Sequence, residues 1–154
     1  MDLREVLSSE ATLMDRQDFN KLVGFHCIEF GDSYCKGEIV LNQMHTNPIG
    51  SIHGGVLFTL ADVVGGNAAF SSGRFPTTLS SSMNFLRPVI GCERLIGESR
   101  EVKNGKNVAV YEVTITDEKD NVIAVATMTY FYLPDHVQKS LQEKYRLQLE
   151  ENDA

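Results

Sequence analysis

Residues 54–70 form a long apolar stretch, and it constrains the fold of this chain more than any other segment. The stretch begins with the pair Gly54-Gly55, continues mainly through valine, leucine, phenylalanine and alanine, and stops before Ser71-Ser72-Gly73. A helix exposed to water carries many charges, whereas a buried helix normally carries none. This stretch carries a single carboxylate, Asp62, near its middle. The sequence therefore predicts a buried helix over about 54–70, with one acidic side chain for which catalysis is one explanation.

Segments typical of β-strands lie on both sides of this helix. The clearest is 107–117, where alternate apolar side chains predict a strand with one face on a core. Asn104-Gly105 predicts a type I′ hairpin before it, and Asp120-Asn121 a turn after it. The other predicted strands are two within 25–41, around Gly31-Asp32-Ser33, and then 77–86, 92–103 and 121–132. These elements predict an α+β fold in which a curved antiparallel sheet of about five or six strands wraps one long helix, the arrangement called the hotdog fold.

The two ends of the chain are also predicted to be helical. Asp15 is placed to cap a helix over 16–23 that ends at Gly24. Residues 135–150 carry the narrow apolar stripe of a surface helix, for which packing or a subunit contact is the expected role. We expect a single domain over 1–154, with its core at about 20–133, an N-terminal helical extension at 1–23 and this C-terminal helix.

Charge and cysteine content argue against several classes of partner and location. The 154 residues carry a formal net charge of −7, which disfavours nucleic acid because phosphate binding needs clustered Lys and Arg. The first ten residues do not resemble a signal peptide, and no apolar run reaches membrane-spanning length. Cys27, Cys35 and Cys92 are odd in number and lack a CxxC spacing, so free thiols in a cytoplasmic protein are expected.

The Gly54-Gly55 pair places backbone amides at the start of the predicted helix. The first N–H groups of a helix have no partner within it, and the helix dipole is positive there. Glycine also lets another molecule approach the backbone closely. The pair is suited to hold an oxyanion or a polarised carbonyl, although a tight entry into a packed helix explains it equally well.

Asp62 follows Gly54 by eight residues, which corresponds to about 12 Å along a helix. An aspartate side chain does not cover that distance, so if both groups act on one carbonyl they come from different chains. Two antiparallel copies of the helix around a twofold axis would bring Gly54 of one chain near Asp62 of the other. The spacing therefore favours a homodimer with two composite sites. The alternative is a buried carboxylate that is satisfied by hydrogen bonds.

Polar side chains before the helix are further candidates. Asn47 can donate its amide to a carbonyl or orient a water molecule, but Asn-Pro is also a common turn. His53 is expected to cap the helix or to orient the Gly54 loop, and contact with the carbonyl is the alternative. His45, His53 and Asp62 lack a metal-ligand spacing, so no metal site is expected.

At these residues the chain resembles the hotdog-fold acyl-CoA thioesterases of the phenylacetate-pathway (PaaI-like) group. The resemblance covers about residues 20–133, and an aspartate at position 62 resembles the branch that pairs Asn with Asp. The other branch of that superfamily pairs Gln with Glu. The matching pattern is His45-x-Asn47-x-x-Gly50-x-x-His53-Gly54-Gly55, then Leu60-Ala61-Asp62, then Ser80-x-x-Met83-Asn84-Phe85-x-Arg87-Pro88.

This resemblance implies hydrolysis of an acyl-CoA thioester to a free acid and CoA, without a cofactor. The Gly54 amide would bind the thioester oxygen with Asn47 as a second donor, and Asp62 of the partner chain would act as base or nucleophile. Ser80 would lie near the nucleophilic water, although Ser81 and Ser82 follow it and leave the register open. Relatives are often tetramers, so a dimer of dimers is expected.

The phosphates of CoA call for basic groups, and other functions stay open at this level. Arg87, Lys103 and Lys106 are candidates to meet CoA, with Gly55 as a further substrate contact, although surface Lys and Arg are usually solvated. A hotdog dehydratase is one alternative, but it pairs a catalytic His with a carboxylate across a Pro-Gly helix entry. A non-catalytic acyl-CoA-binding domain is the other, but a regulator of that kind needs a DNA-binding module, for which the stretch before residue 24 is too short.

Overall fold

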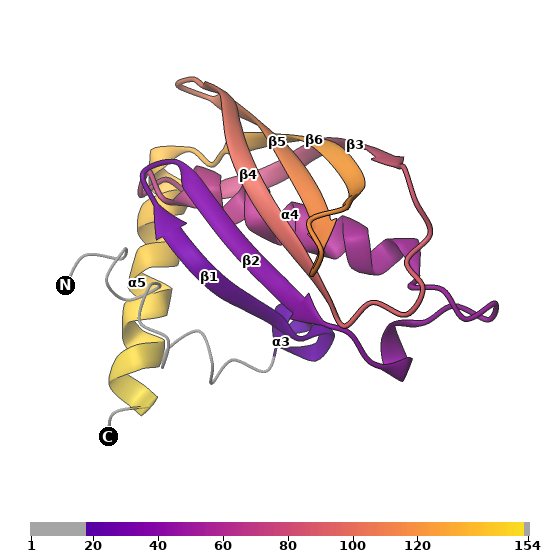
Figure 1. Cartoon of the computed structure of the whole chain (residues 1–154). Helices are drawn as coiled ribbons and strands as arrows, with labels where there is room; N and C mark the ends of the chain where they lie inside the picture. Colours follow the sequence, from indigo (N-terminus) through magenta and orange to yellow (C-terminus); the bar gives the residue numbers. More distant parts are fainter. Residues whose placement is uncertain (1–17, 153–154) are drawn as a thin grey trace.

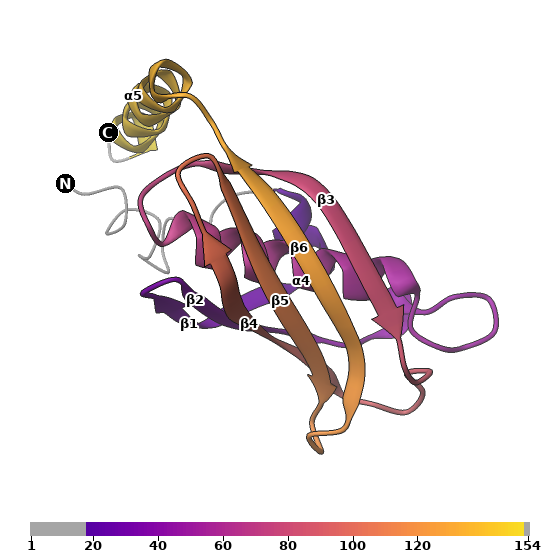
Figure 2. The same ribbon diagram turned by 90° about the horizontal axis from the view of Figure 1, so that it is seen from above.

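One six-stranded antiparallel sheet curves around a single long helix, α4 (Figure 1). The computed structural model describes residues 18–152 and the side chains of residues 18–144. The sheet order is β1-β2-β4-β5-β6-β3, so β3, which follows α4 in sequence, forms one edge beside β6 (Figure 2). The helices are α3 (Phe19–Val23), the 3₁₀ turn η1 (Gln43–His45), α4 (Gly54–Phe70) and α5 (Asp135–Asn152). The strands are β1 (Phe25–Gly31), β2 (Tyr34–Val40), β3 (Pro76–Phe85), β4 (Arg94–Asn104), β5 (Val108–Asp117) and β6 (Val122–Tyr132). The α+β hotdog prediction is confirmed.

Helix α4 is buried because the inner face of the sheet packs against most of its circumference. Leu60, Ala61 and Val64 are completely inaccessible to solvent, and a Cβ atom on Gly97 of β4 would come within 3.0 Å of Leu60 Cγ. The alternation along β5 supplies the opposing surface, since Tyr111, Val113 and Ile115 are also fully buried. The predicted helix and the predicted inward face of this strand are both confirmed.

One side of α4 is not covered by the sheet of its own chain. Gly55 and Phe58 are exposed and Thr59 and Asp62 are half-buried, and these four residues define what we call the open face of α4. They lie within one helical stripe because residues three or four apart are neighbours on a helix surface. Asp62 is thus on the border between core and surface rather than enclosed in the core.

The hairpins follow the prediction in position but not in turn type. A type I′ turn needs positive φ at both central residues, and this occurs at Asp32 and Ser33, with φ of 51° and 63°. No residue between Asn104 and Val108 has positive φ, and Gly105 N–H donates to Val108 O at 2.9 Å. The type I′ prediction at Asn104-Gly105 is therefore wrong. The guanidinium of Arg74 donates to Gly105 O and to Lys106 O, both at 2.9 Å, and it ties this loop to the end of α4.

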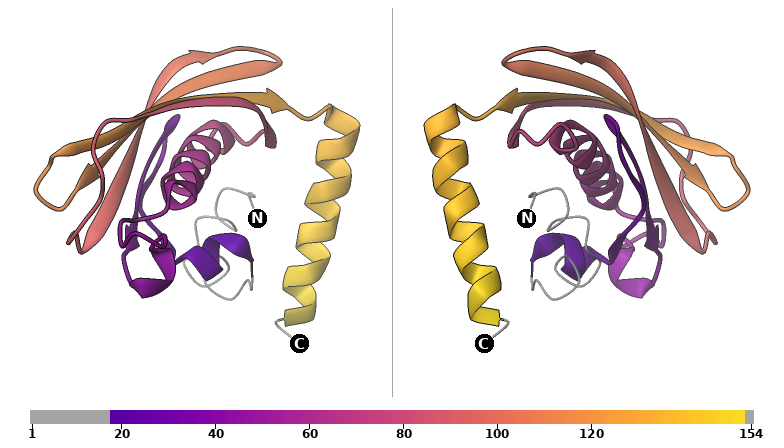
Figure 3. Two further views of the ribbon diagram at one scale, coloured as in Figure 1. Left: turned by 90° about the vertical axis from the view of Figure 1, so that its right-hand side faces the viewer. Right: turned by 90° about the vertical axis from the view of Figure 1, so that its left-hand side faces the viewer.

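Both predicted terminal helices are present: α3 is described from Phe19, and α5 continues two residues beyond the predicted end at residue 150. The N-cap of α3 is Asp18, whose carboxylate accepts from Lys21 N–H at 3.1 Å, and the predicted cap, Asp15, lies outside the described residues. Gly24 ends α3 as expected, with φ of 84°. Helix α5 extends from the end of β6 on the same side of the sheet as α4 (Figure 3). Within residues 18–152 no helix has the length and apolarity needed to cross a bilayer.

Candidate active site

The start of α4 leaves one backbone amide free for a ligand. His53 is the N-cap, and its Nδ1 accepts from Gly55 N–H at 2.9 Å. Gly54 is the first helical residue, and its N–H has no hydrogen-bond partner among the described residues. The expected capping role of His53 is therefore confirmed. Of the two glycines, Gly54 rather than Gly55 offers a donor at the positive end of the helix dipole.

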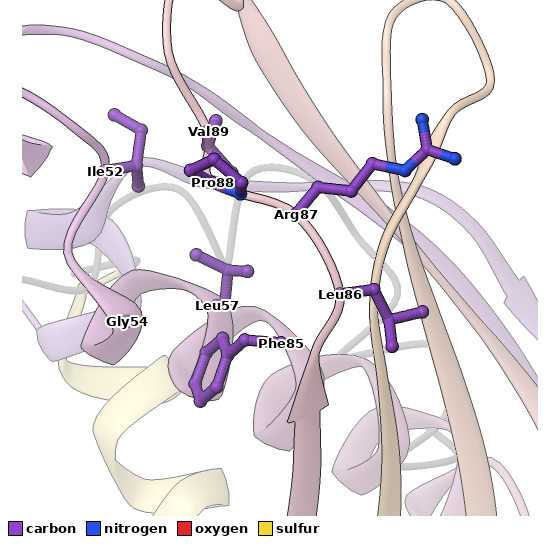
Figure 4. A pocket seen from close by; sticks show the side chains of 8 residues that line it. All are labelled: Ile52, Gly54, Leu57, Phe85, Leu86, Arg87, Pro88 and Val89. Carbon is purple, nitrogen blue, oxygen red and sulfur yellow. The ribbon is translucent and has the colours of Figure 1, made fainter.

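An apolar hollow of about 320 Å³ adjoins Gly54 (Figure 4). A Cβ atom on Gly54 would lie 3.3 Å from Phe85 Cζ, so the ring of Phe85 lies directly over this backbone. Phe85 also packs edge-on against Phe58, with the ring centroids 5.8 Å apart. Arg87, which is exposed, is the charged group on the lining. The complete lining is Ile52, Gly54, Leu57, Phe85, Leu86, Arg87, Pro88 and Val89.

Asp62 lies outside this hollow and contacts β3 instead. The hydroxyl of Thr78 donates to Asp62 Oδ1 at 2.6 Å, a short distance typical of a hydroxyl bonded to a carboxylate. None of the residues that line the Gly54 hollow is Asp62 or Thr78. Within a single chain, the Gly54 N–H with its apolar hollow and the Asp62 carboxylate with its bond to Thr78 therefore lie at two separate places.

A β-bulge in β3 decides which hydroxyl reaches Asp62. Thr78 pairs with Tyr130 of β6, whereas Ser80 pairs with Thr129, and the pairing register shifts between them. The extra residue, Leu79, reverses the alternation of side chains. Thr78 and Ser81 consequently share the inner face that packs on α4, while Ser80 shares the outer face with Thr129. The structure does not bring the predicted Ser80 to Asp62. Thr78 was not predicted at this place, because a pattern of uniform alternation contains no sign of the bulge.

Asn47 is occupied by contacts within its own loop, and His45 contacts both its own turn and the end of α3. The Asn47 side chain accepts from Ile49 N–H and Ser51 N–H, both at 3.1 Å, and donates to Ser51 Oγ at 2.7 Å. This is the turn that an Asn-Pro sequence favours. The buried His45 accepts from Asn42 N–H at 3.0 Å and its Nε2 lies 2.8 Å from Val23 O. In the described part of the chain, no three His, Cys, Asp or Glu side chains are grouped as metal ligands.

The candidate CoA-binding residues divide between two ends of the molecule. Arg87 lies at the hollow near the start of α4. Lys103 and Lys106 lie around the β4–β5 loop, which Arg74 holds near the end of the same helix. The 17 residues of α4 span about 25 Å. One chain therefore does not join these three cations into a single phosphate site.

Comparison with known proteins identifies thioesterases among the relatives of this chain. A family model described as the thioesterase superfamily matches residues 49–124. A 1,4-dihydroxy-2-naphthoyl-CoA thioesterase from Arabidopsis thaliana is 30% identical over 135 residues, covering 80% of this chain and 86% of the relative. The acyl-coenzyme A thioesterase PaaI of Escherichia coli (strain K12) is 26% identical over 105 residues, covering 68% and 75% of the two chains.

Solved structures give the same result. A hypothetical thioesterase from Streptococcus pneumoniae TIGR4, determined with coenzyme A, is 28% identical with a TM-score of 0.67, covering 71% of this chain and 85% of that chain. Two further structures of that protein each carry one alanine substitution. One replaces an aspartate and the other a threonine sixteen positions later in its sequence.

Proposed function

This chain belongs to the thioesterase superfamily, and we propose that it hydrolyses acyl-CoA thioesters at composite sites between two subunits. It is a hotdog-fold acyl-CoA thioesterase of the PaaI-like group. In each proposed site the Gly54 amide of one subunit binds the thioester oxygen. Asp62 of the other subunit either attacks the thioester carbonyl carbon or activates a water molecule that does so. The observation that carries this proposal is the separation, within one chain, of the Gly54 hollow from the Asp62–Thr78 pair.

The exposed edge of the sheet supports pairing of two chains beside α4. An edge strand offers unpaired backbone groups, and proteins usually protect such edges with charges or proline. Strand β3 has ten residues, none of them charged, and only its first is proline. Leu79 is 61% exposed and Phe85 51% exposed on this strand. Antiparallel pairing of β3 with its copy would place the open faces of the two α4 helices toward one another.

The spacing along α4 fixes where the twofold axis would fall. If Gly54 of one helix faces Asp62 of an antiparallel copy, the midpoint between them is residue 58. Residue 58 is Phe58, which is 38% exposed in the single chain. A half-exposed aromatic ring in the first half of a core helix is explained if it packs on its own copy at the axis.

Thioester hydrolysis requires only the groups present here, namely the Gly54 amide of one subunit and the Asp62–Thr78 pair of the other. The Gly54 N–H at the helix start would stabilise the negative charge that develops on the thioester oxygen. Thr78 occupies one oxygen of Asp62 and leaves the other free to accept a proton from water, whose oxygen then attacks the carbonyl carbon. The tetrahedral intermediate collapses with loss of the CoA thiolate, which takes up a proton. Direct attack by Asp62 on the carbonyl carbon uses the same geometry: the CoA thiolate leaves and takes up a proton, and water then hydrolyses the resulting anhydride.

The S. pneumoniae thioesterase supports the pairing of Asp62 with Thr78. The aspartate and threonine replaced in its two variants are sixteen positions apart, as Asp62 and Thr78 are here. Arg87 at the hollow would meet the CoA moiety, two dimers would associate through surfaces other than β3, and the three free thiols suit the cytoplasm.

Steady-state hydrolysis of a panel of acyl-CoA substrates, graded by chain length and aromaticity, tests this function. We expect Asp62→Asn to lose most turnover while its melting temperature stays near that of the wild type. Asp120→Asn is the matched control, because Asp120 is exposed in the β5–β6 turn and its φ of 63° suits asparagine. Near-normal kcat in Asp62→Asn, or CoA binding without turnover by the wild type, would overturn the proposal.

A further inference from the structure

Two residues opposite one another in the sheet both hold Asp62. Thr78 of β3 and Tyr130 of β6 are directly paired across the strands, and both face α4. Thr78 donates to the carboxylate of Asp62 at 2.6 Å, and the Tyr130 hydroxyl donates to the main-chain oxygen of the same residue at 2.9 Å. The side chain and the backbone of Asp62 are thus attached to the sheet by one cross-strand pair.

The helix has a gap that fits the Tyr130 side chain. A Cβ atom on Gly65 would lie 2.5 Å from the Tyr130 hydroxyl oxygen, and one on Gly66 would lie 3.6 Å from Tyr130 Cε1. Tyr130 itself is 1% exposed and packs edge-on against Tyr111, with the ring centroids 6.3 Å apart. The hydroxyl therefore reaches a mid-helix carbonyl because the helix lacks side chains at that point, and the ring has little room to move.

The environment of the Tyr130 hydroxyl favours its protonated form, which is the form that donates a hydrogen bond. Burial raises its pKa well above the ordinary value, and the nearby negative charge of Asp62 raises it further. The carbonyl oxygen of Asp62 is already the natural acceptor of an intrahelical bond. The helix therefore does not need the hydrogen bond from Tyr130 in order to form. The effect of this second bond is to set the position of this turn of α4 relative to the sheet.

We propose that Tyr130 is a positioning residue for thioester hydrolysis, which holds the turn of α4 at the height where Thr78 can bind the Asp62 carboxylate. The proposal rests on the role of Asp62 given above. Displacement of a reacting group by about 1 Å can cost on the order of 100-fold in rate. Loss of the Tyr130 hydroxyl should therefore lower kcat without a matching change in KM.

The chain offers a matched control two residues away on the same strand. Tyr132 is also buried, and its hydroxyl donates to Asn104 Oδ1 at 2.8 Å and lies 3.3 Å from the carbonyl oxygen of Ala69 of α4. Tyr130→Phe and Tyr132→Phe each remove one buried hydroxyl of β6 that contacts α4, but only the first removes a contact with Asp62. We expect kcat to fall about 10- to 100-fold in Tyr130→Phe and to change by less than about threefold in Tyr132→Phe.

A double mutant separates positioning from a merely structural role. If Tyr130 acts by presenting Asp62 to Thr78, then Tyr130→Phe should cost little further kcat in a Thr78→Val background. A crystal structure of Tyr130→Phe should show the Thr78 Oγ1 to Asp62 Oδ1 distance beyond about 3.5 Å. Gly65→Ala, which forces the same hydroxyl away, should reproduce the loss of kcat if Tyr130→Phe does not fold.

The outcomes distinguish this inference from the proposed function. Equal kcat in Tyr130→Phe and Tyr132→Phe, or multiplicative losses with Thr78→Val, overturns the positioning role alone. Full activity in Asp62→Asn, measured in parallel, overturns the role of Asp62 and this inference with it. The positioning role of Tyr130 and the role of Asp62 are both supported if Tyr130→Phe lowers kcat in the wild-type background but causes little further loss in the Thr78→Val background.

Discussion

The hydroxyl of Thr78 lies 2.6 Å from Asp62 Oδ1, which joins the edge strand of the sheet to the single carboxylate of the core helix. Thr78 is exposed, so replacing it leaves no cavity in the core. We expect Thr78→Val, which keeps the shape and removes the donor, to lower kcat at least about tenfold because the carboxylate loses its orientation. Thr78→Ser keeps the hydroxyl and should retain most activity. Steady-state kinetics decides this, and equal kcat in the two variants would show that the bond is incidental.

Most of the fold could be predicted because its signals are local. The apolar run with one carboxylate identifies α4, and the alternation of Ala109, Tyr111, Val113 and Ile115 identifies the inward face of β5. Both patterns depend on neighbouring residues of one element, and the structure buries these residues as the patterns require. A sheet that wraps one helix is then the architecture that buries both apolar surfaces.

The parts of the candidate site that could not be predicted depend on contacts between distant segments. One extra residue at Leu79 decides whether Thr78 or Ser80 faces α4, and no local pattern marks it. The Asn104-Gly105 loop takes its form from Arg74, some 30 residues earlier in the chain. Sequence spacing did predict that Gly54 and Asp62 are too far apart to act together within a chain, because helix rise is a fixed quantity.

The amide of Gly54 can be removed without changing the start of the helix. Proline is favoured at the first helical position, and the preceding His53 has the extended conformation that proline requires, with ψ of 134°. We expect Gly54→Pro to lower kcat by about 10²–10³ through loss of the oxyanion donor. Gly54→Ala makes the same new contact with Phe85, at 3.3 Å, but keeps the N–H, so it should retain far more activity.

Mixing two inactive variants tests whether the site is shared. In a heterodimer, the Asp62→Asn chain supplies an intact Gly54 and the Gly54→Pro chain supplies an intact Asp62. Random pairing on co-expression makes half of the dimers mixed, so about a quarter of wild-type activity should return. Absence of any recovery in co-expressed protein, despite heterodimers detected by mass spectrometry, would rule out a composite site.

Phe58 should control dimer formation, because the proposed axis passes beside it. Phe58→Glu brings two like charges together at the axis, while the side chain is already 38% exposed in one chain. We expect this variant to sediment as a smaller species in analytical ultracentrifugation and to lose activity. Val40→Glu is the control, since Val40 is 56% exposed on β2, far from β3 in the sheet order. An active Phe58→Glu monomer would contradict the dimeric site.

Asp117 should make the stability of the β5–β6 turn depend on pH. Its carboxylate accepts hydrogen bonds from Asn121 Nδ2, Asn121 N–H and Lys119 N–H, each at 2.9 Å, and these bonds lower its pKa below the ordinary 3.8. A carboxyl with a lowered pKa in the folded state contributes its full stability above the ordinary value and loses it as pH falls through the lowered value. Asp117→Asn should therefore be less stable than wild type at pH 7, and the difference should shrink as pH falls below the ordinary value of 3.8.

Urea unfolding at several pH values measures this difference, with Asp120→Asn in the same turn as the control. Asp120 is exposed, and its left-handed backbone suits asparagine, so its replacement should change stability little at any pH. If the stability gap between wild type and Asp117→Asn stays constant down to pH 2, the charge of Asp117 is not what holds the turn. If the gap shrinks as pH falls, the ionised carboxylate is the form that accepts all three hydrogen bonds, which explains why an acidic residue is buried at the end of β5.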